Sequence, residues 1–424
     1  MRNRSNLIGS IVLVMILLTM LIFTLATCSN PSGEGGGGDV DKLLTSITVD
    51  WTALKNFGIG EPLNSAEKVW TITATFDDAS TQTIQNNIAG LTWDPPDFSA
   101  TAGSNKTVTV SYGGQSAVIT GINVLTLNER VAAVADGAIV TINLYADETI
   151  NASININSNR NIELKGVDSE RMIKNNCYAN IFALQNYAQL TFGENITLQS
   201  IAASHEAAAV VFFGVSSTFT MKNNSKITGH KNNVPNGAGA AVACGMGGMT
   251  LDLFNAIVIE GGEISGNSTA GYGAGIYIID GAILTINGGK IESNISDIYG
   301  NDVHILGDVP PINISGKAQI GQLSLYAYNN SDRRGKITVA SNFTGSVTSL
   351  DLVTKDNWTT SIVPFILPEA GQTLTKELLD KFTLGNFLSS SFPYPSEPIT
   401  PGYHLYGTKS GEINPDNFGK LVAD

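Results

Sequence analysis

The chain has 424 residues, of which 14% are charged and 42% hydrophobic, and its formal net charge is −13. This acidic balance excludes nucleic acid as a partner, because phosphate contacts need clustered Lys and Arg. Low charge, 44 glycines and many Asn, Ser and Thr residues predict an all-β protein with short strands and tight turns.

Residues 1–28 have the organisation of an export signal. Arg2 and Arg4 precede the apolar run LIGSIVLVMILLTMLIFTLA, and Cys28 follows it closely. Charged, hydrophobic and cleavage regions in this order are typical of a secretory signal peptide. An uncleaved anchor is the alternative, since about 20 apolar residues can span a bilayer.

The tetrad LATC at the end of this run resembles the lipobox of bacterial lipoproteins, although Thr27 stands where Gly, Ala or Ser is usual. The resemblance implies that Cys28 carries a lipid and becomes the mature N-terminus. We therefore expect an exported protein held to the membrane by this anchor, at the outer membrane or cell surface. Residues 29–42, SNPSGEGGGGDVDK, cannot bury apolar surface and are expected to form a flexible tether.

Residues 43–125 contain short alternating runs separated by turn signals. In VWTITATF the apolar residues largely alternate with threonine, as in a half-buried strand, and the whole segment predicts a β-sandwich. The phrases GEPL, TATFDDAS and AGSNKTVTVSYGG resemble bacterial Ig-like domains of cell-surface proteins, which implies a spacer or adhesion module. Trp51, Trp70 and Trp93 are expected in the core, with carbohydrate stacking as the alternative.

Residues 126–345 are organised in repeats. A short helix is expected first, in ERVAAVADGA with Asn128 as its cap. The phrase GGEISGN at Gly261 then recurs 27 positions later as GGKIESN at Gly288, and the residues that follow each copy align without a gap. A unit of about 27 residues with three short strands fits one coil of a parallel β-helix. Looser copies align the isoleucines Ile196, Ile227, Ile264, Ile291 and Ile320.

This region resembles the right-handed parallel β-helices of the pectin-lyase-like superfamily, and more closely the GGxIxGN repeats of bacterial surface lipoproteins and adhesins. The superfamily includes polysaccharide lyases and glycoside hydrolases, which need converging carboxylates and basic residues. No arginine occurs between Leu190 and Tyr326. The sequence therefore favours a non-catalytic surface binding or adhesion protein. A lyase or hydrolase on the same fold and a purely structural or antigenic surface protein are the alternatives.

Few residues of the repeats suggest chemistry. Asp297 and Asp302 are expected to be solvated turn residues rather than calcium ligands. His205, His230 and His304 fall in different coils without the spacing of metal ligands, so they are expected to be incidental. No metal or other cofactor is expected.

Two pairs of residues recur one coil apart. Asn267 and Asn294 are expected to form a structural amide ladder. Tyr272 and Tyr299 are expected to stack at about 4.8 Å, the strand spacing. A plain aromatic stack is the favoured interpretation. A sugar-binding platform is the alternative, and it makes this pair the candidate ligand-binding site. The inserted segments NNVPNGAG and GMGGMTLDLFNA are candidate contact surfaces. An extracellular glycan or a host or cell-surface protein is the expected partner.

The cysteines of the repeat region are Cys177 and Cys244. Small or apolar neighbours surround both, so free buried thiols are favoured over a disulfide.

Residues 346–424 are expected to end the β-helix and cap it, because an open end would expose unpaired strands and apolar core. TLTKELLDKFTL predicts a short helix, and YHLYGTKSGEI predicts a hairpin around Lys409 to Gly411.

Overall fold

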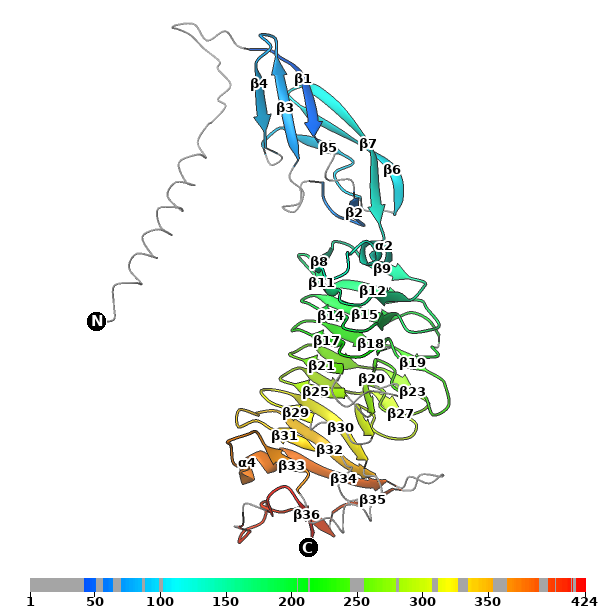
Figure 1. Ribbon diagram of the computed structural model, residues 1–424, viewed down its shortest axis with the longest axis vertical. Helices are drawn as coiled ribbons and strands as arrows, with labels where there is room; N and C mark the ends of the chain where they lie inside the picture. The colour runs from blue at the N-terminus through cyan, green and yellow to red at the C-terminus, as the bar shows by residue number, and fades with distance from the viewer. Residues whose placement is uncertain are drawn as a thin grey trace, which may run out of the picture.

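The computed structural model describes residues 42–50, 56–63, 70–85, 88–98, 102–203, 205–212, 214–244, 255–279, 282–306, 312–326, 335–353, 364–388, 396–400, 402–412, 414 and 417–424. Residues 1–41, with the predicted signal, Cys28 and most of the predicted tether, lie outside the described residues. A small antiparallel β domain precedes a long column of parallel strands, and the C-terminal segments lie at the far end of the column (Figure 1). The predicted fold class, all-β with an Ig-like sandwich, a right-handed parallel β-helix and a C-terminal cap, is confirmed. None of the helices in the described part of the chain has the length and apolarity to cross a bilayer.

The N-terminal domain is built from two small sheets, ordered β1-β3-β4 and β2-β7-β6-β5. Trp70 fills the core, as predicted. It is 1% exposed, stacks on Phe57 with ring centroids 5.8 Å apart, and donates from Nε1 to the carbonyl of Leu63 at 2.5 Å. Trp93 is half-buried against the same core, and Trp51 lies outside the described residues. The strands are β1 (Leu44–Asp50), β2 (Asn56–Gly58), β3 (Thr71–Phe76), β4 (Thr81–Ile84), β5 (Thr92–Asp94), β6 (Gly103–Tyr112) and β7 (Gln115–Leu125).

Helix α2 (Leu127–Ala132) follows β7 and covers the open end of the β-helix. The predicted cap, Asn128, is wrong: Thr126 is the cap. Its hydroxyl accepts from the amide of Glu129 at 3.3 Å, while the Glu129 carboxylate accepts from the amide of Thr126 at 2.8 Å. This reciprocal capping box starts the helix earlier than the apolar pattern suggested. Leu127 and Val131 then bury themselves against the first coil.

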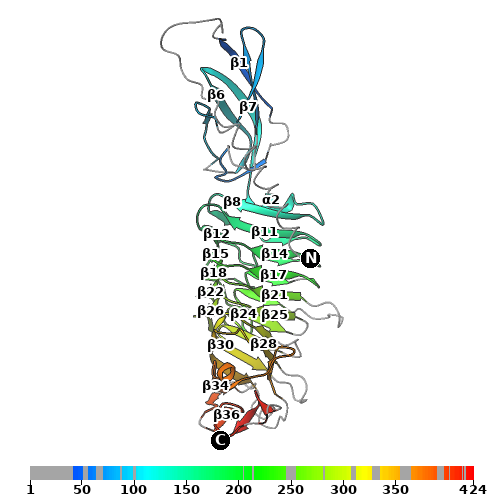
Figure 2. The same cartoon turned by 90° about the vertical axis from the view of Figure 1, so that its left-hand side faces the viewer.

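The β-helix has three faces, named here A, B and C, and each coil adds one strand to each face (Figure 2). Face A contains β8 (Ile139–Leu144), β11 (Asn161–Gly166), β14 (Gln189–Phe192), β17 (Thr218–Met221), β21 (Asn255–Ile259), β25 (Ala282–Ile286), β29 (Ile312–Ile314), β31 (Ile337–Val339) and β33 (Ile366–Pro368). Face B contains β9 (Glu148–Ile150), β12 (Arg171–Asn175), β15 (Ile196–Ser200), β18 (Lys226–Thr228), β22 (Glu263–Ser265) and β26 (Lys290–Glu292). Face C contains β10 (Ile154–Ile156), β13 (Phe182–Leu184), β16 (Val210–Phe212), β20 (Val242–Cys244), β24 (Ile276–Ile279) and β28 (Val303–Leu306).

The last coils are joined across two faces. Strand β30 (Gln319–Tyr326) pairs with both β26 and β28, and so joins faces B and C, which β32 (Ser346–Val353) and β34 (Phe382–Leu388) continue. A short side sheet contains β19 (Lys231–Asn232), β23 (Ser268–Thr269) and β27 (Ile295–Ser296). In the chain, each of its strands follows a strand of face B and precedes a strand of face C.

The register of the strands agrees with the two clear repeats. Ile264 pairs with Ile291 on face B, and both side chains are buried in the core. The looser alignment fails at one copy: Leu198, and not Ile196, pairs with Ile227. Ile196 and Leu198 are both buried in β15. An alignment shifted by two residues therefore fits the apolar pattern equally well. The core is a continuous stack of like residues, in which Phe192 and Phe219 meet edge to face at 5.1 Å.

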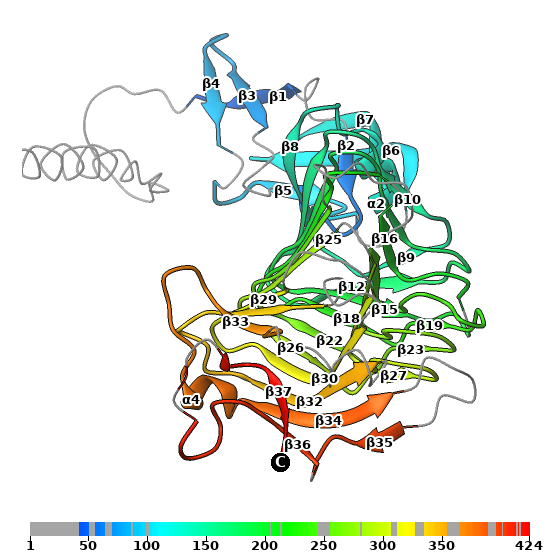
Figure 3. The ribbon, with the colours of Figure 1, turned by 60° about the horizontal axis from the view of Figure 1, so that its bottom comes forward.

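The C-terminal segments close the column, and Figure 3 shows them with the end of the molecule turned forward. The predicted helix is present as α4 (Lys376–Leu379), with Thr375 as its cap. The predicted hairpin around Lys409 is wrong, because β36 (Tyr403–Leu405) pairs antiparallel with β37 (Leu421–Ala423) instead. This longer-range pairing buries Leu405 and Leu421, which a local hairpin would have left apart. Strand β35 (Ser396–Pro398) pairs antiparallel with β34.

Candidate functional site

The predicted platform of Tyr272 and Tyr299 is an aromatic cluster. The two ring centroids lie 5.6 Å apart with the planes at 41°, and His304 stacks on Tyr272 at 5.4 Å. Tyr299 is only 4% exposed, and Tyr277 joins the cluster from face C. A sugar platform needs an open ring face, so this burial favours the plain aromatic stack. His304 belongs to the same stack, and burial lowers its pKa to about 3.

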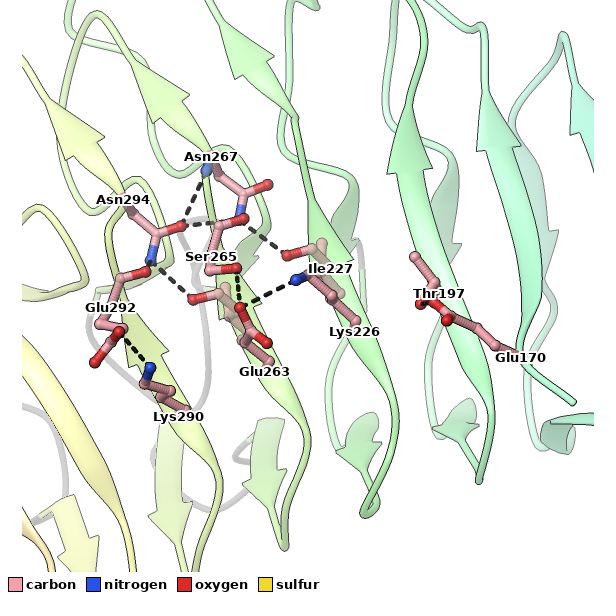
Figure 4. Close-up of polar contacts among 11 residues, drawn as sticks. Glu170, Thr197, Lys226, Ile227, Glu263, Ser265, Asn267, Lys290, Glu292 and Asn294 are labelled. Carbon is pink, nitrogen blue, oxygen red and sulfur yellow. Dashed lines mark hydrogen bonds and ion pairs between the residues drawn. The ribbon is translucent and has the colours of Figure 1, made fainter.

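Asn267 and Asn294 form a hydrogen-bonded ladder along the axis of the column (Figure 4). The amide of Asn267 donates from Nδ2 to Oδ1 of Asn294 at 2.9 Å, and the backbone N–H of Asn267 donates to the same oxygen at 3.1 Å. Nδ2 of Asn294 donates to the carbonyl of Ile264 at 3.0 Å. Both asparagines are buried, and the contacts satisfy polar groups at the corner after face B.

Asp302 extends this ladder, and the prediction that it is a solvated turn residue is wrong. It is 4% exposed and accepts from Asn294 Nδ2 at 2.8 Å and from the amide of Gln322 at 2.7 Å. Burial raises the pKa of Asp302. The loop after β27 returns to the corner and places this carboxylate where the next amide of the ladder would stand. Asp297, by contrast, is exposed, as predicted.

A row of charged side chains crosses the outer side of face B, on β18, β22 and β26 (Figure 4). Lys226 Nζ lies 3.1 Å from Glu263 Oε1, and Lys290 Nζ lies 2.5 Å from Glu292 Oε1. The Ser265 hydroxyl also donates to Glu263 and, with Lys226, lowers the pKa of that carboxyl. Acids and bases in this row neutralise one another. A carboxyl with a lowered pKa stays ionised at neutral pH and cannot act as a general acid there.

His205 and His230 come together, although the sequence placed them in separate coils. Their ring centroids lie 5.3 Å apart, and burial lowers the pKa of both, that of His230 to about 3. His205 Nε2 lies 2.6 Å from Ser200 Oγ, and its Nδ1 lies 2.7 Å from the carbonyl of Cys177. A Ser–His contact is also the start of a nucleophile–base pair. Here the ring is 2% exposed, which favours a structural role.

The described residues contain no group of three or more His, Cys, Asp or Glu side chains arranged to hold a metal ion. Cys177 and Cys244 are free and buried, which confirms that prediction. Burial raises the pKa of both thiols.

A groove lies where the N-terminal domain meets the first coils of the β-helix, and we call it the junction groove. Its volume is about 740 Å³. A smaller cavity of about 240 Å³ beside it shares Thr141, Asn143 and Tyr145 and continues toward Arg130. The junction groove is lined by Pro62, Thr141, Asn143, Tyr145, Glu163, Lys165, Gly166, Val167, Asp168 and Asn195.

The two domains pack closely beside this groove. Gly60 has a φ of 74°, and a Cβ on it would lie 2.8 Å from the Cβ of Ala146. Arg130 donates to the carbonyl of Asn143 at 2.7 Å and forms an ion pair with the buried carboxylate of Glu148. Glu148 also accepts from the amide of Leu127 at 2.6 Å. The arginine therefore ties the start of face A to the helix that covers it.

No sequence motif marks the junction groove. Pro62 belongs to the GEPL phrase of one domain, whereas Thr141 and Tyr145 belong to the first coil of the other. A site built from two domains leaves no single spacing pattern. The available signal was indirect: the polar and aromatic residues of NLYADET run from the end of β8 to the start of β9, at the domain boundary, where ligand sites are frequent.

No protein-family model matches this chain, and no curated protein matches it significantly. The site therefore has to be interpreted from its own geometry.

Proposed function

We propose that this chain is a lipid-anchored protein of the bacterial cell envelope, and that it is a non-catalytic binding or adhesion protein. Its Ig-like domain and β-helix resemble the modules of bacterial surface lipoproteins. The order of apolar run, Cys28 and glycine-rich tether supports the anchor. A tether of this kind would hold the folded column away from the membrane.

The observation that carries the binding function is the junction groove. It is a cavity of about 740 Å³ at a domain boundary, with polar side chains lining an open space. Sites for small ligands typically have volumes of about 300–1,000 Å³ and favour such boundaries. The charged residues outside face B support the non-catalytic part, because Glu263 and Lys290 are engaged in ion pairs with neighbouring side chains.

A polysaccharide lyase or glycoside hydrolase stays the alternative on this fold. A glycoside hydrolase would need a carboxyl with a raised pKa beside its substrate. The pKa of Glu263 is lowered. The pKa of Asp302 is raised, but its carboxyl group is buried in hydrogen bonds with the ladder and is not accessible to a substrate. A purely structural surface protein is the third hypothesis, and a binding assay separates it from the first.

Membrane fractionation with metabolic labelling by palmitate tests the anchor. We expect the unaltered chain in the membrane fraction with label incorporated, and Cys28→Ala unlabelled and released. Ser29→Ala, one residue further on, is the control and should behave as the unaltered chain. Retention of Cys28→Ala in the membrane would favour an uncleaved apolar anchor instead. Whole-cell binding with and without surface expression of the chain tests adhesion itself.

A further inference from the structure

We propose that the junction groove binds a neutral oligosaccharide, with the ring of Tyr145 stacking on a sugar. This inference rests on the proposed binding function and adds to it the location of the site and the class of its ligand. The shape of the groove, the chemistry of its lining and its charge support this ligand class.

The shape suits an extended ligand. The groove is open to solvent and holds about 740 Å³, enough for a short oligosaccharide. Its lower wall is the first two strands of face A, β8 and β11, which pair in parallel from Ile139↔Asn161 to Leu144↔Gly166. Thr141 and Glu163 are partners in this register, and both line the groove. A chain longer than the groove could therefore continue across the outer side of face A.

The next positions on face A are compatible with such a continuation. The row that begins at Thr141 and Glu163 passes to Thr191, Thr220 and Val258. These side chains are half-buried and small, so the surface is low in charge. The row continues through Thr285, Asn313 and Thr338.

The chemistry of the lining matches the two kinds of surface that a sugar presents. Sugars have apolar C–H faces, and the half-buried ring of Tyr145 and the ring of Pro62 supply flat apolar partners for them. Sugars also carry hydroxyl groups that both donate and accept. Thr141, Asn143 and Asn195 supply groups of the same dual character in the groove.

The charge of the lining favours a neutral ligand over an acidic one. One lysine, Lys165, and two carboxylates, Glu163 and Asp168, line the groove, and Glu163 Oε1 lies 2.9 Å from Lys222 Nζ. Lys165 Nζ also lies 3.6 Å from a carboxylate oxygen of Glu194, which reduces its attraction for a further anion. A polyuronate would need a surplus of cations to offset its charge, as phosphate chains do. The chain as a whole has a net charge of −13.

The walls of the groove are held before any ligand arrives. Arg130 fixes the carbonyl of Asn143, as described above. On the floor, a Cβ on Gly166 would lie 2.2 Å from the carbonyl oxygen of Asn195, so the two turns touch directly. A preformed site avoids part of the ordering cost of binding.

The test uses the full chain in detergent, screened on an array that carries neutral, amino-sugar and uronate oligosaccharides. The neutral sugar that binds best is then titrated calorimetrically. We expect Tyr145→Ala to weaken binding about tenfold or more, as expected for the loss of a stacking contact. Tyr178→Ala is the matched control: this tyrosine is 71% exposed and lies outside the groove. It should bind as the unaltered chain does.

Thr141→Leu is the second variant, because Thr141 is an exposed strand residue and leucine there should obstruct the groove without disturbing the core. It should also weaken binding, with an unchanged circular dichroism spectrum. If both variants bind the sugar with the affinity of the unaltered chain, the junction groove is not the binding site. That result would not contradict the proposed binding function. A preference for uronates would overturn the ligand class. If no glycan binds, the inference fails, and the whole-cell assay alone then judges the proposed function.

Discussion

Replacing Asn294 with alanine would cut the amide ladder in the middle of the β-helix. Its side chain accepts from the backbone and side chain of Asn267 at 3.1 and 2.9 Å. It donates to the carbonyl of Ile264 at 3.0 Å and to the carboxylate of Asp302 at 2.8 Å. Alanine can replace none of these contacts, and the site is closed to water because Asn294 is 3% exposed.

Two losses dominate the expected cost. The buried N–H of Asn267 loses an acceptor, which costs about 1–3 kcal/mol, and the buried carboxyl group of Asp302 loses a donor, which also costs about 1–3 kcal/mol. We therefore expect Asn294→Ala to lower the free energy of unfolding by about 3–5 kcal/mol. Because each coil contacts only its neighbours, the loss should be concentrated in the coils on either side of β26.

Guanidinium unfolding followed by circular dichroism measures this free energy. The matched control is Asn223→Ala, at an exposed turn asparagine that precedes β18. It should change stability by no more than about 0.5 kcal/mol. If Asn294→Ala costs no more than this control, the ladder does not stabilise the fold and the reasoning is refuted.

Three further predictions follow from buried groups. Cys177 and Cys244 should resist a disulfide reagent at pH 8 until guanidinium is added, because burial raises the pKa of both thiols; rapid native labelling of Cys244 would contradict this. Burial also raises the pKa of Asp351 on β32. The stability that this carboxyl group contributes is therefore fully present below its unfolded pKa of about 3.9, and it is lost as the pH rises through the folded pKa. Asp351→Asn should therefore gain stability relative to the unaltered chain as the pH rises above about 4, and a difference that does not vary with pH in denaturation curves would count against this. Arg130→Met should cost about 3–5 kcal/mol by leaving Glu148 buried and unpaired, and adding Glu148→Gln should restore part of the loss in the same unfolding assay.

The repeated coil could be predicted because its positions recur without a gap. Ile264 and Ile291 pair as the alignment requires. The looser copies could not be aligned by pattern alone: Ile196 and Leu198 lie two positions apart and are both buried. Only the pairing of Leu198 with Ile227 distinguishes them. The repeat period therefore predicts where the strands lie. The register between strands separated by an insertion depends on how they pair in three dimensions.

The candidate site was harder to predict because its parts come from distant segments. Asp302 had no counterpart in the preceding coil, where Gly275 stands, so nothing in the repeat marked it as a ladder residue. The stacking of Tyr272 and Tyr299 followed from their spacing, but their burial depends on other side chains of the cluster. Tyr145 gains its significance only from the approach of the N-terminal domain.

Hydrogen exchange of the full chain with and without the neutral oligosaccharide that binds best tests the central claim most directly, that ligand binds at the domain junction. We expect slower exchange in the segment after β8 around Tyr145 and in the turn at Val167 and Asp168, which line the groove. Exchange near Tyr272 and Tyr299 should be unchanged. Protection confined to these two tyrosines, with none at the junction, would contradict the account.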